Sequence, residues 1–264
     1  MDWLHPLSGL LVGFIVGLTG VGGGSLMAPI MILVLGVAPV TAVGTDLWFA
    51  AVTKMIGGLV HHRQRGADGG PDWQIILRLC VGSLPLAVLM LWLLAQTGTA
   101  QIKAGLIMQL LGIVLVLTAA ATLLRPQLHR LAARLRAGGA GTRYRRWQAP
   151  LTILSGAILG ALVTLTSIGA GALGATLLLA IYPLRLTMRR LVATDIVHAV
   201  PLTVVAGLGH LWIGTVDLAL LGSLLIGSIP GIVAGSLLTT RISDRILRPA
   251  LAAVLTFAGL RLLL

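Results

Sequence analysis

Long apolar segments alternate with short polar ones along almost the whole chain. The apolar segments lie at approximately residues 7–35, 41–60, 73–95, 102–124, 150–180, 187–209, 217–239 and 246–264. An α-helix needs about 20 consecutive apolar residues to cross the hydrocarbon core of a bilayer, and most of these segments have that length. The pattern therefore predicts an all-α polytopic membrane protein.

Two segments, 7–35 and 150–180, are too long for one straight crossing. A helix of about 30 residues is about 45 Å long, whereas the hydrocarbon core is about 30 Å thick. Glycines interrupt each segment near its middle, at Gly20–Ser25 and at Ser167–Gly171, and a glycine destabilises a helix by roughly 1 kcal/mol relative to alanine. We interpret each segment as a broken, re-entrant hairpin of two short half-helices.

The two halves of the chain repeat each other in the same order. Leu18–Gly24 aligns with Leu165–Gly171, Thr45 and Asp46 with Thr194 and Asp195, His61 with His210, Asp72 with Asp217, and Gly82–Pro85 with Gly227–Pro230. Matches spread this widely indicate an internal repeat. The predicted organisation is a first repeat over 1–124, a basic linker over 125–149 and a second repeat over 150–264.

The basic residues indicate how the repeats are oriented. Fifteen of the 19 Lys and Arg residues fall in the connections around 61–72, 125–149, 181–190 and 240–249. If each repeat is one re-entrant hairpin plus three transmembrane helices, the two repeats are inverted and these connections share one face. Cytoplasmic loops are enriched in Lys and Arg, so the inverted repeat is favoured, as in many transporters. It predicts a cytoplasmic linker and periplasmic termini.

Composition excludes several classes of function. The chain is 57% hydrophobic, with a mean hydropathy of +1.02 and a net charge of +12. Since the positive charge lies in loops, we expect it to set topology beside anionic lipid, with no nucleic acid as partner. Cys80 is the single cysteine, which excludes an internal disulfide and a cysteine-based zinc site. Gly169–Gly174 matches the dinucleotide pattern G-x-G-x-x-G, but without a βαβ unit around it. We expect no cofactor, no metal and no enzymatic activity.

Glycines at four-residue spacing precede both breaks. Gly9, Gly13 and Gly17 form one series, and Gly156 and Gly160 form the other. Small residues at this spacing let helix backbones approach closely in membranes. We expect these glycines to pack the half-helices of each hairpin against each other.

A helix restarts after each break, near Ser25 and near Ala172. The first N–H groups of a helix have no partner within the helix and carry partial positive charge, so a small anion is their natural ligand. Two opposed helix ends would form one substrate site at the membrane midplane. The backbone of this site would come from Gly22, Gly23, Gly24, Gly169 and Gly171, and hydroxyl donors from Thr19, Ser25, Thr166 and Ser167. The alternative is that these hydroxyls only satisfy local backbone groups.

Lys54 and His198 are polar residues well inside apolar segments. An ammonium group at membrane depth is costly and points to a functional site, so we expect Lys54 to bind the anion, although its side chain could instead extend toward the membrane surface. Thr203 stands at the repeat-equivalent position. His198 could bind the anion or carry a proton, or be a hydrogen-bonded core histidine.

Four aspartates lie near predicted helix starts. We expect Asp46 and Asp195, which both follow a threonine, to cap their helices, with a role as a gate or in ion coupling as the alternative. Asp72 and Asp217 are expected to be caps only.

The glycine-rich break, Pro29, the segment Ala42–Thr45, and the His and Gly residues shortly before Asp72 resemble the sulfite exporter TauE/SafE family. The resemblance covers nearly the whole chain. The second half departs from the motif, with Thr176 at the position of Pro29 and Ala193 at that of Gly44.

The resemblance implies a multi-pass carrier in a bacterial inner membrane that transports sulfite or an organosulfonate such as sulfoacetate. Export is the expected direction, because the inside-negative potential favours anion efflux by about 2.3 kcal/mol per charge per 100 mV. Proton coupling through His198 or an aspartate is left open, and a homodimer is a possible assembly. The alternatives are an importer, a carrier of another small solute, and a membrane-embedded enzyme or assembly factor.

Overall fold

The computed structural model describes residues 3–19, 26–63, 70–96, 100–137, 146–183, 185–238 and 244–264. At 19, 57–63, 100–103, 129–137, 188 and 244–246 the description covers the backbone only. The described residues form ten α-helices and no β-strand, which confirms the all-α prediction. The helices are α1 (Leu4–Thr19), α2 (Met27–Leu33), α3 (Pro39–Arg63), α4 (Trp73–Gln96), α5 (Ala100–Ala137), α6 (Gln148–Thr166), α7 (Ala172–Ile181), α8 (Met188–Ile213), α9 (Leu218–Leu238) and α10 (Asp244–Leu263).

Five of the described helices are long and apolar enough to cross a membrane. They are α4, α6 and α9 in full, most of α8, and residues 104–128 of α5. The chain is therefore a membrane protein with several apolar helices. We also expected crossings at 41–60 and 246–264, where α3 and α10 lie, but these two are not among the five. The topology with six crossings and two re-entrant hairpins stays a prediction.

The segment 150–180 is broken at the predicted place, but the two pieces are unequal. α6 has 19 residues and α7 has 10. At 1.5 Å per residue, α6 is about 28 Å long, nearly the thickness of the hydrocarbon core. α6 is therefore longer than the short half-helix that we expected, and the re-entrant arrangement of this segment stays a prediction.

The predicted linker 125–149, a loop that we expected to be partly helical, starts within a helix at residue 125. α5 continues through it as one helix of 38 residues, with Pro126 inside it. The Arg125 side chain is buried, so the first part of the predicted loop 125–149 is a packed helix.

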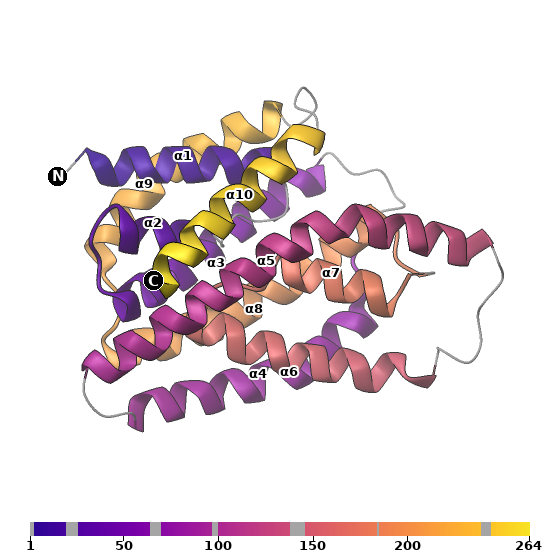
Figure 1. Cartoon of the computed structure of the whole chain (residues 1–264), viewed down its shortest axis with the longest axis horizontal. Helices are drawn as coiled ribbons and strands as arrows, with labels where there is room; N and C mark the ends of the chain where they lie inside the picture. The colour runs from indigo at the N-terminus through magenta and orange to yellow at the C-terminus, as the bar shows by residue number, and fades with distance from the viewer. Residues whose placement is uncertain are drawn as a thin grey trace.

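Two tight helix pairs form opposite edges of the molecule in Figure 1, and each pair joins one repeat to the other. α1 packs along α9, α4 packs along α6, and α5 and α10, which contact each other, lie between these two pairs in this view. The glycine series lie in these contacts: Gly9, Gly13 and Gly17 lie against the backbone of α9, and Gly156 and Gly160 against that of α4. The expectation that the glycines pack the two parts of one hairpin together is therefore wrong, because they hold helices of different repeats in backbone contact.

The contacts between the halves come in reciprocal pairs. α4 packs on α8 as α9 packs on α3. The backbone N–H of Asp72 donates to the Thr194 hydroxyl at 3.0 Å, and that of Asp217 donates to the Thr45 hydroxyl at 3.1 Å. A pseudo-twofold relation between repeats has this property. The opposite orientation of the two repeats across the membrane stays a prediction.

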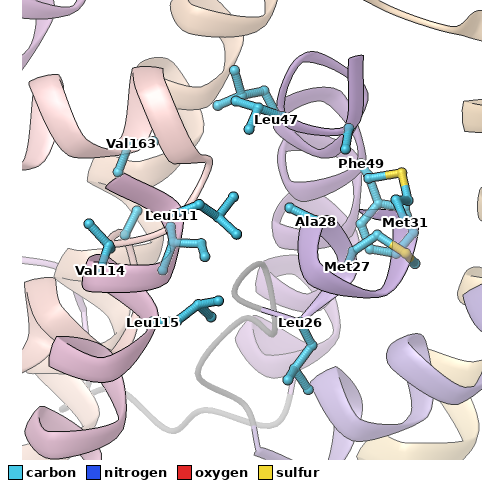
Figure 2. Packing of buried hydrophobic residues seen from close by; sticks show 14 of the residues in the cluster. Leu26, Met27, Ala28, Met31, Leu47, Phe49, Leu111, Val114, Leu115 and Val163 are labelled. Atoms are coloured by element: carbon cyan, nitrogen blue, oxygen red, sulfur yellow. The ribbon is translucent and has the colours of Figure 1, made fainter. Parts of the chain in front are cut away.

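The short helix α2 is part of the hydrophobic core. Met27, Ala28, Pro29 and Met31 are buried there, and Figure 2 shows side chains of α2 beside those of α3, with Leu111 and other residues of α5 close by.

The outer face of α4 is apolar and exposed. More than half of the surface is exposed for each of Trp73, Leu77, Val81, Val88 and Trp92. An apolar outer surface at helical spacing fits contact with lipid.

Candidate functional site

The break between α6 and α7 is a strained backbone segment that faces the interior. Ser167 ends α6 in a left-handed conformation with φ of 59°, and Gly169 and Gly171 have φ of 128° and 139°. A left-handed conformation is costly for a residue with a side chain, so the surrounding structure must hold it. Residues 166–171 are all buried.

The two hydroxyl groups at this break behave differently. Thr166 donates to the Leu162 carbonyl at 2.6 Å and accepts from the Ile168 N–H, so its hydroxyl satisfies local backbone. The Ser167 hydroxyl is buried and has no hydrogen-bond partner. Of the two predicted donors, Ser167 is the one that remains available to a ligand.

Lys54 reaches this break from the other half of the chain. Its Nζ atom donates to the carbonyl oxygen of Ala170 at 2.8 Å, and the lysine is only 4% exposed. The alternative that the side chain extends toward the membrane surface is therefore wrong. The repeat-equivalent Thr203 donates its hydroxyl to Ala199, one turn earlier in its own helix, so the lysine is present on one side of the pseudo-symmetric arrangement only.

Asp46 and Asp195 lie near the same break and are not caps of the helices that carry them. Each stands seven residues after the start of its helix, α3 or α8, and each is buried. The capping interpretation of this pair is wrong, because both side chains point from a helix interior into the core. The Lys54 ammonium interacts electrostatically with both carboxylates, more strongly with Asp195.

Asp195 occupies the start of α7, where we predicted a bound anion. The backbone N–H of Gly171 faces its carboxylate, and the Cα of Gly174 lies directly against its Oδ1 atom. A carboxylate at a helix N-terminus complements the partial positive charge there. The protein itself thus supplies the negative group for this helix end, and an external anion would have to bind beside it.

His198 lies close to this group. Its Nε2 atom is 2.9 Å from the Ser83 hydroxyl of α4, and its Nδ1 atom is buried without a hydrogen-bond partner. The ring also lies within electrostatic range of the Lys54 ammonium. His198 is therefore more than a fully satisfied core histidine, since one ring nitrogen remains available.

Buried polar atoms without partners are concentrated in this region. Native proteins leave few such atoms, and each one needs an explanation, often a ligand or a water. Within the described residues they include both carboxylate oxygens of Asp46, Oδ1 of Asp195, the hydroxyls of Ser167 and Thr164, and Nδ1 of His198. We call the group of Asp46, Lys54, Ser167, Asp195 and His198 the break cluster.

The remaining predicted residues have different outcomes. The first break lies outside the described residues, and with it Gly22, Gly23, Gly24, Ser25 and the side chain of Thr19. Gly169 and Gly171 allow the positive φ values of the second break. In the part of the chain that the structure describes, no group of three or more His, Cys, Asp or Glu residues is placed to hold a metal ion.

Sequence reasoning missed two groups that interact with the break cluster. The Ala170 carbonyl is a backbone group, so no residue type marks it. Arg125 was assigned to a loop, yet it is buried and its charge reaches Asp195. Pro126 directly follows Arg125 and points to the end of a helix there, so the local sequence carried no signal for its burial.

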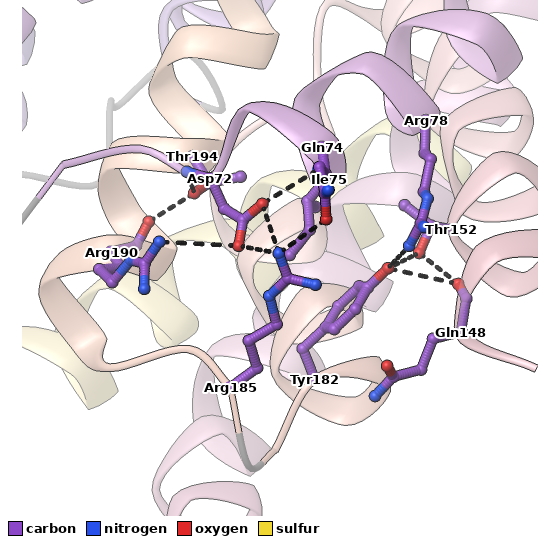
Figure 3. Close-up of polar contacts among 10 residues, drawn as sticks. All are labelled: Asp72, Gln74, Ile75, Arg78, Gln148, Thr152, Tyr182, Arg185, Arg190 and Thr194. Atoms are coloured by element: carbon purple, nitrogen blue, oxygen red, sulfur yellow. Dashed lines mark hydrogen bonds and ion pairs between the residues drawn. The ribbon is translucent and has the colours of Figure 1, made fainter. Parts of the chain in front are cut away.

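A second polar cluster joins α4 to the connection between α7 and α8 (Figure 3). The Asp72 carboxylate pairs with Arg185 at 2.8 Å and with Arg190 at 3.7 Å. Asp72 also accepts from the Ile75 N–H, and Asp217 from the Leu220 N–H, so both are caps as predicted. This Asp72 cluster ties the two halves together beside the N-terminus of α8.

A neighbouring group in Figure 3 is centred on Tyr182. The Arg78 guanidinium donates to the Tyr182 hydroxyl at 3.1 Å, and the Thr152 hydroxyl is 2.8 Å from the same oxygen. These contacts fix α4, α6 and the end of α7 relative to one another. The strained break at the other end of α7 is thereby held in place.

Comparison with known proteins gives concordant matches. A family model described as "Sulfite exporter TauE/SafE" matches residues 6–262. The chain is 38% identical over 265 residues to the probable membrane transporter protein YjnA of Bacillus subtilis (strain 168), covering 97% of this chain and 98% of the relative. It is 32% identical over 110 residues to the probable membrane transporter protein YunE of the same organism, covering 40% of this chain and 36% of the relative. No solved structure matches.

Proposed function

This chain belongs to the sulfite exporter TauE/SafE family and is a membrane transporter, and from that premise we propose that it exports a small sulfur-containing oxyanion. The substrate class is sulfite or an organosulfonate such as sulfoacetate, and the location is the cytoplasmic membrane of a bacterium. The inside-negative potential favours efflux of a net negative charge by about 2.3 kcal/mol per 100 mV. Secondary transport needs no ATP site, and the sequence has no Walker-type motif.

The observation that carries this proposal is the buried Lys54 ammonium at the second break. It donates to Ala170 within a segment of strained backbone, and it interacts electrostatically with Asp46, Asp195 and His198, each of which has a buried polar atom without a hydrogen-bond partner. An ammonium has three N–H donors, and a charge buried in a membrane protein marks a site by default. Lys54 and the Ser167 hydroxyl are the groups that we assign to the oxyanion, with His198 as a further donor.

Import, or transport of another small solute, is the first alternative, and a membrane-embedded enzyme or assembly factor is the second. The transporter class is favoured because the polar groups of the break cluster lie at the junction of the two repeats, where carriers bind substrate.

Flux into and out of liposomes that contain the purified protein separates these alternatives. Sulfite, sulfoacetate, taurine, sulfate and thiosulfate would each be tested in both directions. We expect saturable flux of one sulfite- or sulfonate-bearing anion, and if that anion crosses with a net negative charge we expect its flux to be faster in the outward direction with the potential negative inside. Flux of none of these compounds, or a solute without a sulfur oxyanion as the best substrate, would contradict the proposal.

Lys54→Met tests the site itself, because it keeps an unbranched apolar stem and removes the charge. We expect substrate affinity, measured by calorimetry in detergent, to fall by roughly 10- to 150-fold, as for a lost hydrogen bond to a charged group of about 1.5–3 kcal/mol. Lys54→Arg should retain part of the binding. The control is Lys103→Met, which removes the only other lysine of the sequence, in the first turn of α5, and should bind like the parent. Parental binding and flux in Lys54→Met would move the site elsewhere.

A further inference from the structure

Among the described residues, the buried charges around the second break balance before any anion arrives. Lys54 and Arg125 supply two positive charges, and Asp46 and Asp195 supply two negative charges. All four side chains are at most 5% exposed. An anion that bound to this group would leave at least one uncompensated negative charge in a buried site, and an unpaired buried charge is strongly unfavourable. Something else must therefore be neutralised when the anion binds.

The two carboxylates differ in what surrounds them. Asp195 has the stronger interaction with Lys54, the charge of Arg125 within range, and the Gly171 N–H facing it. Asp46 has a weaker interaction with Lys54, and neither of its carboxylate oxygens has a hydrogen-bond partner. The Ser167 hydroxyl and the Ala28 N–H face Asp46, but neither reaches hydrogen-bond geometry, since the carboxylate and the hydroxyl are both without partners. Environments this different assign different roles to paired acids.

We propose that Asp46 binds one proton together with each transported anion, while Asp195 stays ionised as the counter-ion of Lys54. The proposal rests on the proposed function, because it takes the anion to bind at Lys54. Asp46 takes the proton from water on the side where the anion enters and returns it to water on the side where the anion leaves, so no other reactant is needed. The neutral acid can also donate to the oxyanion, which the carboxylate cannot do.

The other charged and titratable groups near Asp46 are few. On its own helix Lys54 follows two turns later. From α8, Asp195 and His198 face the same region, and His210 lies further along, where its Nε2–H donates to the Thr164 carbonyl at 3.0 Å. Arg125 approaches from α5 and Asp217 stands at the start of α9, while α2 and α6 have no ionisable side chain. His198 is thus the one competing proton carrier in the described part of this site.

One bound proton has a consequence for the charge that is moved. A monovalent anion would cross with no net charge, whereas a divalent anion such as sulfite would still move one net negative charge outward. Outward flux of the divalent form would then respond to the membrane potential, and that of a monovalent sulfonate would respond to the pH difference only.

The test measures proton binding with and without the anion. Infrared difference spectra of the anion-free parent, taken as pH is lowered, should show the carbonyl band of a buried carboxylic acid, and Asp46→Asn should lack it. This arm needs no substrate, so it stands even if the screen above finds none. Absence of the band from the parent, or its survival in Asp46→Asn, would overturn the assignment.

The second arm uses calorimetry with sulfoacetate, whose sulfonate does not titrate near neutral pH, in buffers of different ionisation enthalpy. The parent should take up about one proton per anion, and its affinity should fall about tenfold per pH unit at alkaline pH, because linkage is reciprocal. Both effects should vanish in Asp46→Asn and persist in Asp217→Asn, the matched change at an exposed cap. Binding without proton uptake in the parent would refute coupling but leave the anion site intact, whereas loss of uptake in His198→Gln alone would transfer the role to His198.

Discussion

The Asp72 cluster permits a measurement of how firmly the two halves are held together. The carboxylate is almost fully buried, with 3% of its side chain exposed, while the side chains of Arg185 and Arg190 are 41% and 38% exposed. Asp72→Asn keeps an oxygen that can accept from the Ile75 N–H and removes the negative charge. The substitution therefore isolates the ion pairs from the cap.

The expected loss of unfolding free energy in Asp72→Asn lies between two limits. A hydrogen bond to a charged group contributes about 1.5–3 kcal/mol when buried, and an exposed ion pair contributes about 0.2–1 kcal/mol. Because one partner is buried and the other is two-fifths exposed, we expect Asp72→Asn to lower the free energy of unfolding by about 1–2 kcal/mol. For a chain of this size that corresponds to roughly 2–8 °C in Tm.

Asp217→Asn is the matched control for this substitution. Asp217 caps α9 through the Leu220 N–H and donates its own N–H to a threonine of the other half, as Asp72 does at α4, and no ion pair of Asp217 is present in the described residues. Thermal unfolding in one detergent should show a larger loss for Asp72→Asn, and high salt should narrow the difference. Equal losses in the two variants would show that the arginine pairs contribute nothing.

Two further predictions concern topology and helix packing. In a Cys80→Ser background, a cysteine at Gly214 should react with an impermeant thiol reagent from the periplasmic side and one at Thr187 should not; strong periplasmic labelling at Thr187 would contradict the inverted orientation. Gly160→Val should destabilise the protein by about 1–3 kcal/mol through overpacking, since a Cβ there meets the Ser83 Cα at 2.8 Å, whereas Gly222→Val, with nothing within 4 Å, should change the free energy of unfolding by less than about 0.5 kcal/mol.

The elements of the fold could be predicted because their signals are local. Segment length and apolarity located the helices, and the glycines located the break before α7. The extent of α5 could not be predicted in this way, because an apolar segment ends at the first charge while a helix continues as long as its backbone bonds do. Arg125 is helical and buried because neighbouring helices cover it. The sequence around Arg125 gives no indication that other helices pack over this residue.

The break cluster could be predicted only in part for a related reason. Lys54 could be predicted as a candidate site residue because charge within an apolar segment is rare. Its partner Ala170 is 116 residues away, so the contact depends on how the halves pack. Asp46 and Asp195 were assigned to caps because helix starts are uncertain by a few residues in a sequence. Each of these aspartates stands seven residues, or about two turns, after the start of its helix, and this distance decides whether the carboxylate caps the helix or points into the core.

The two repeats differ at Lys54, and this difference would allow Asp46 and Asp195 to have different roles. The repeat places a carboxylate at the same position of α3 and α8, and in a strict duplication Asp46 and Asp195 would have the same surroundings and titrate alike. Lys54 has Thr203 as its counterpart, and the Thr203 hydroxyl is used within its own helix. The single lysine therefore interacts unequally with the two acids, which favours charge on one and a proton on the other. A lysine in both halves would supply each carboxylate with a cation and leave no group whose proton could accompany the anion.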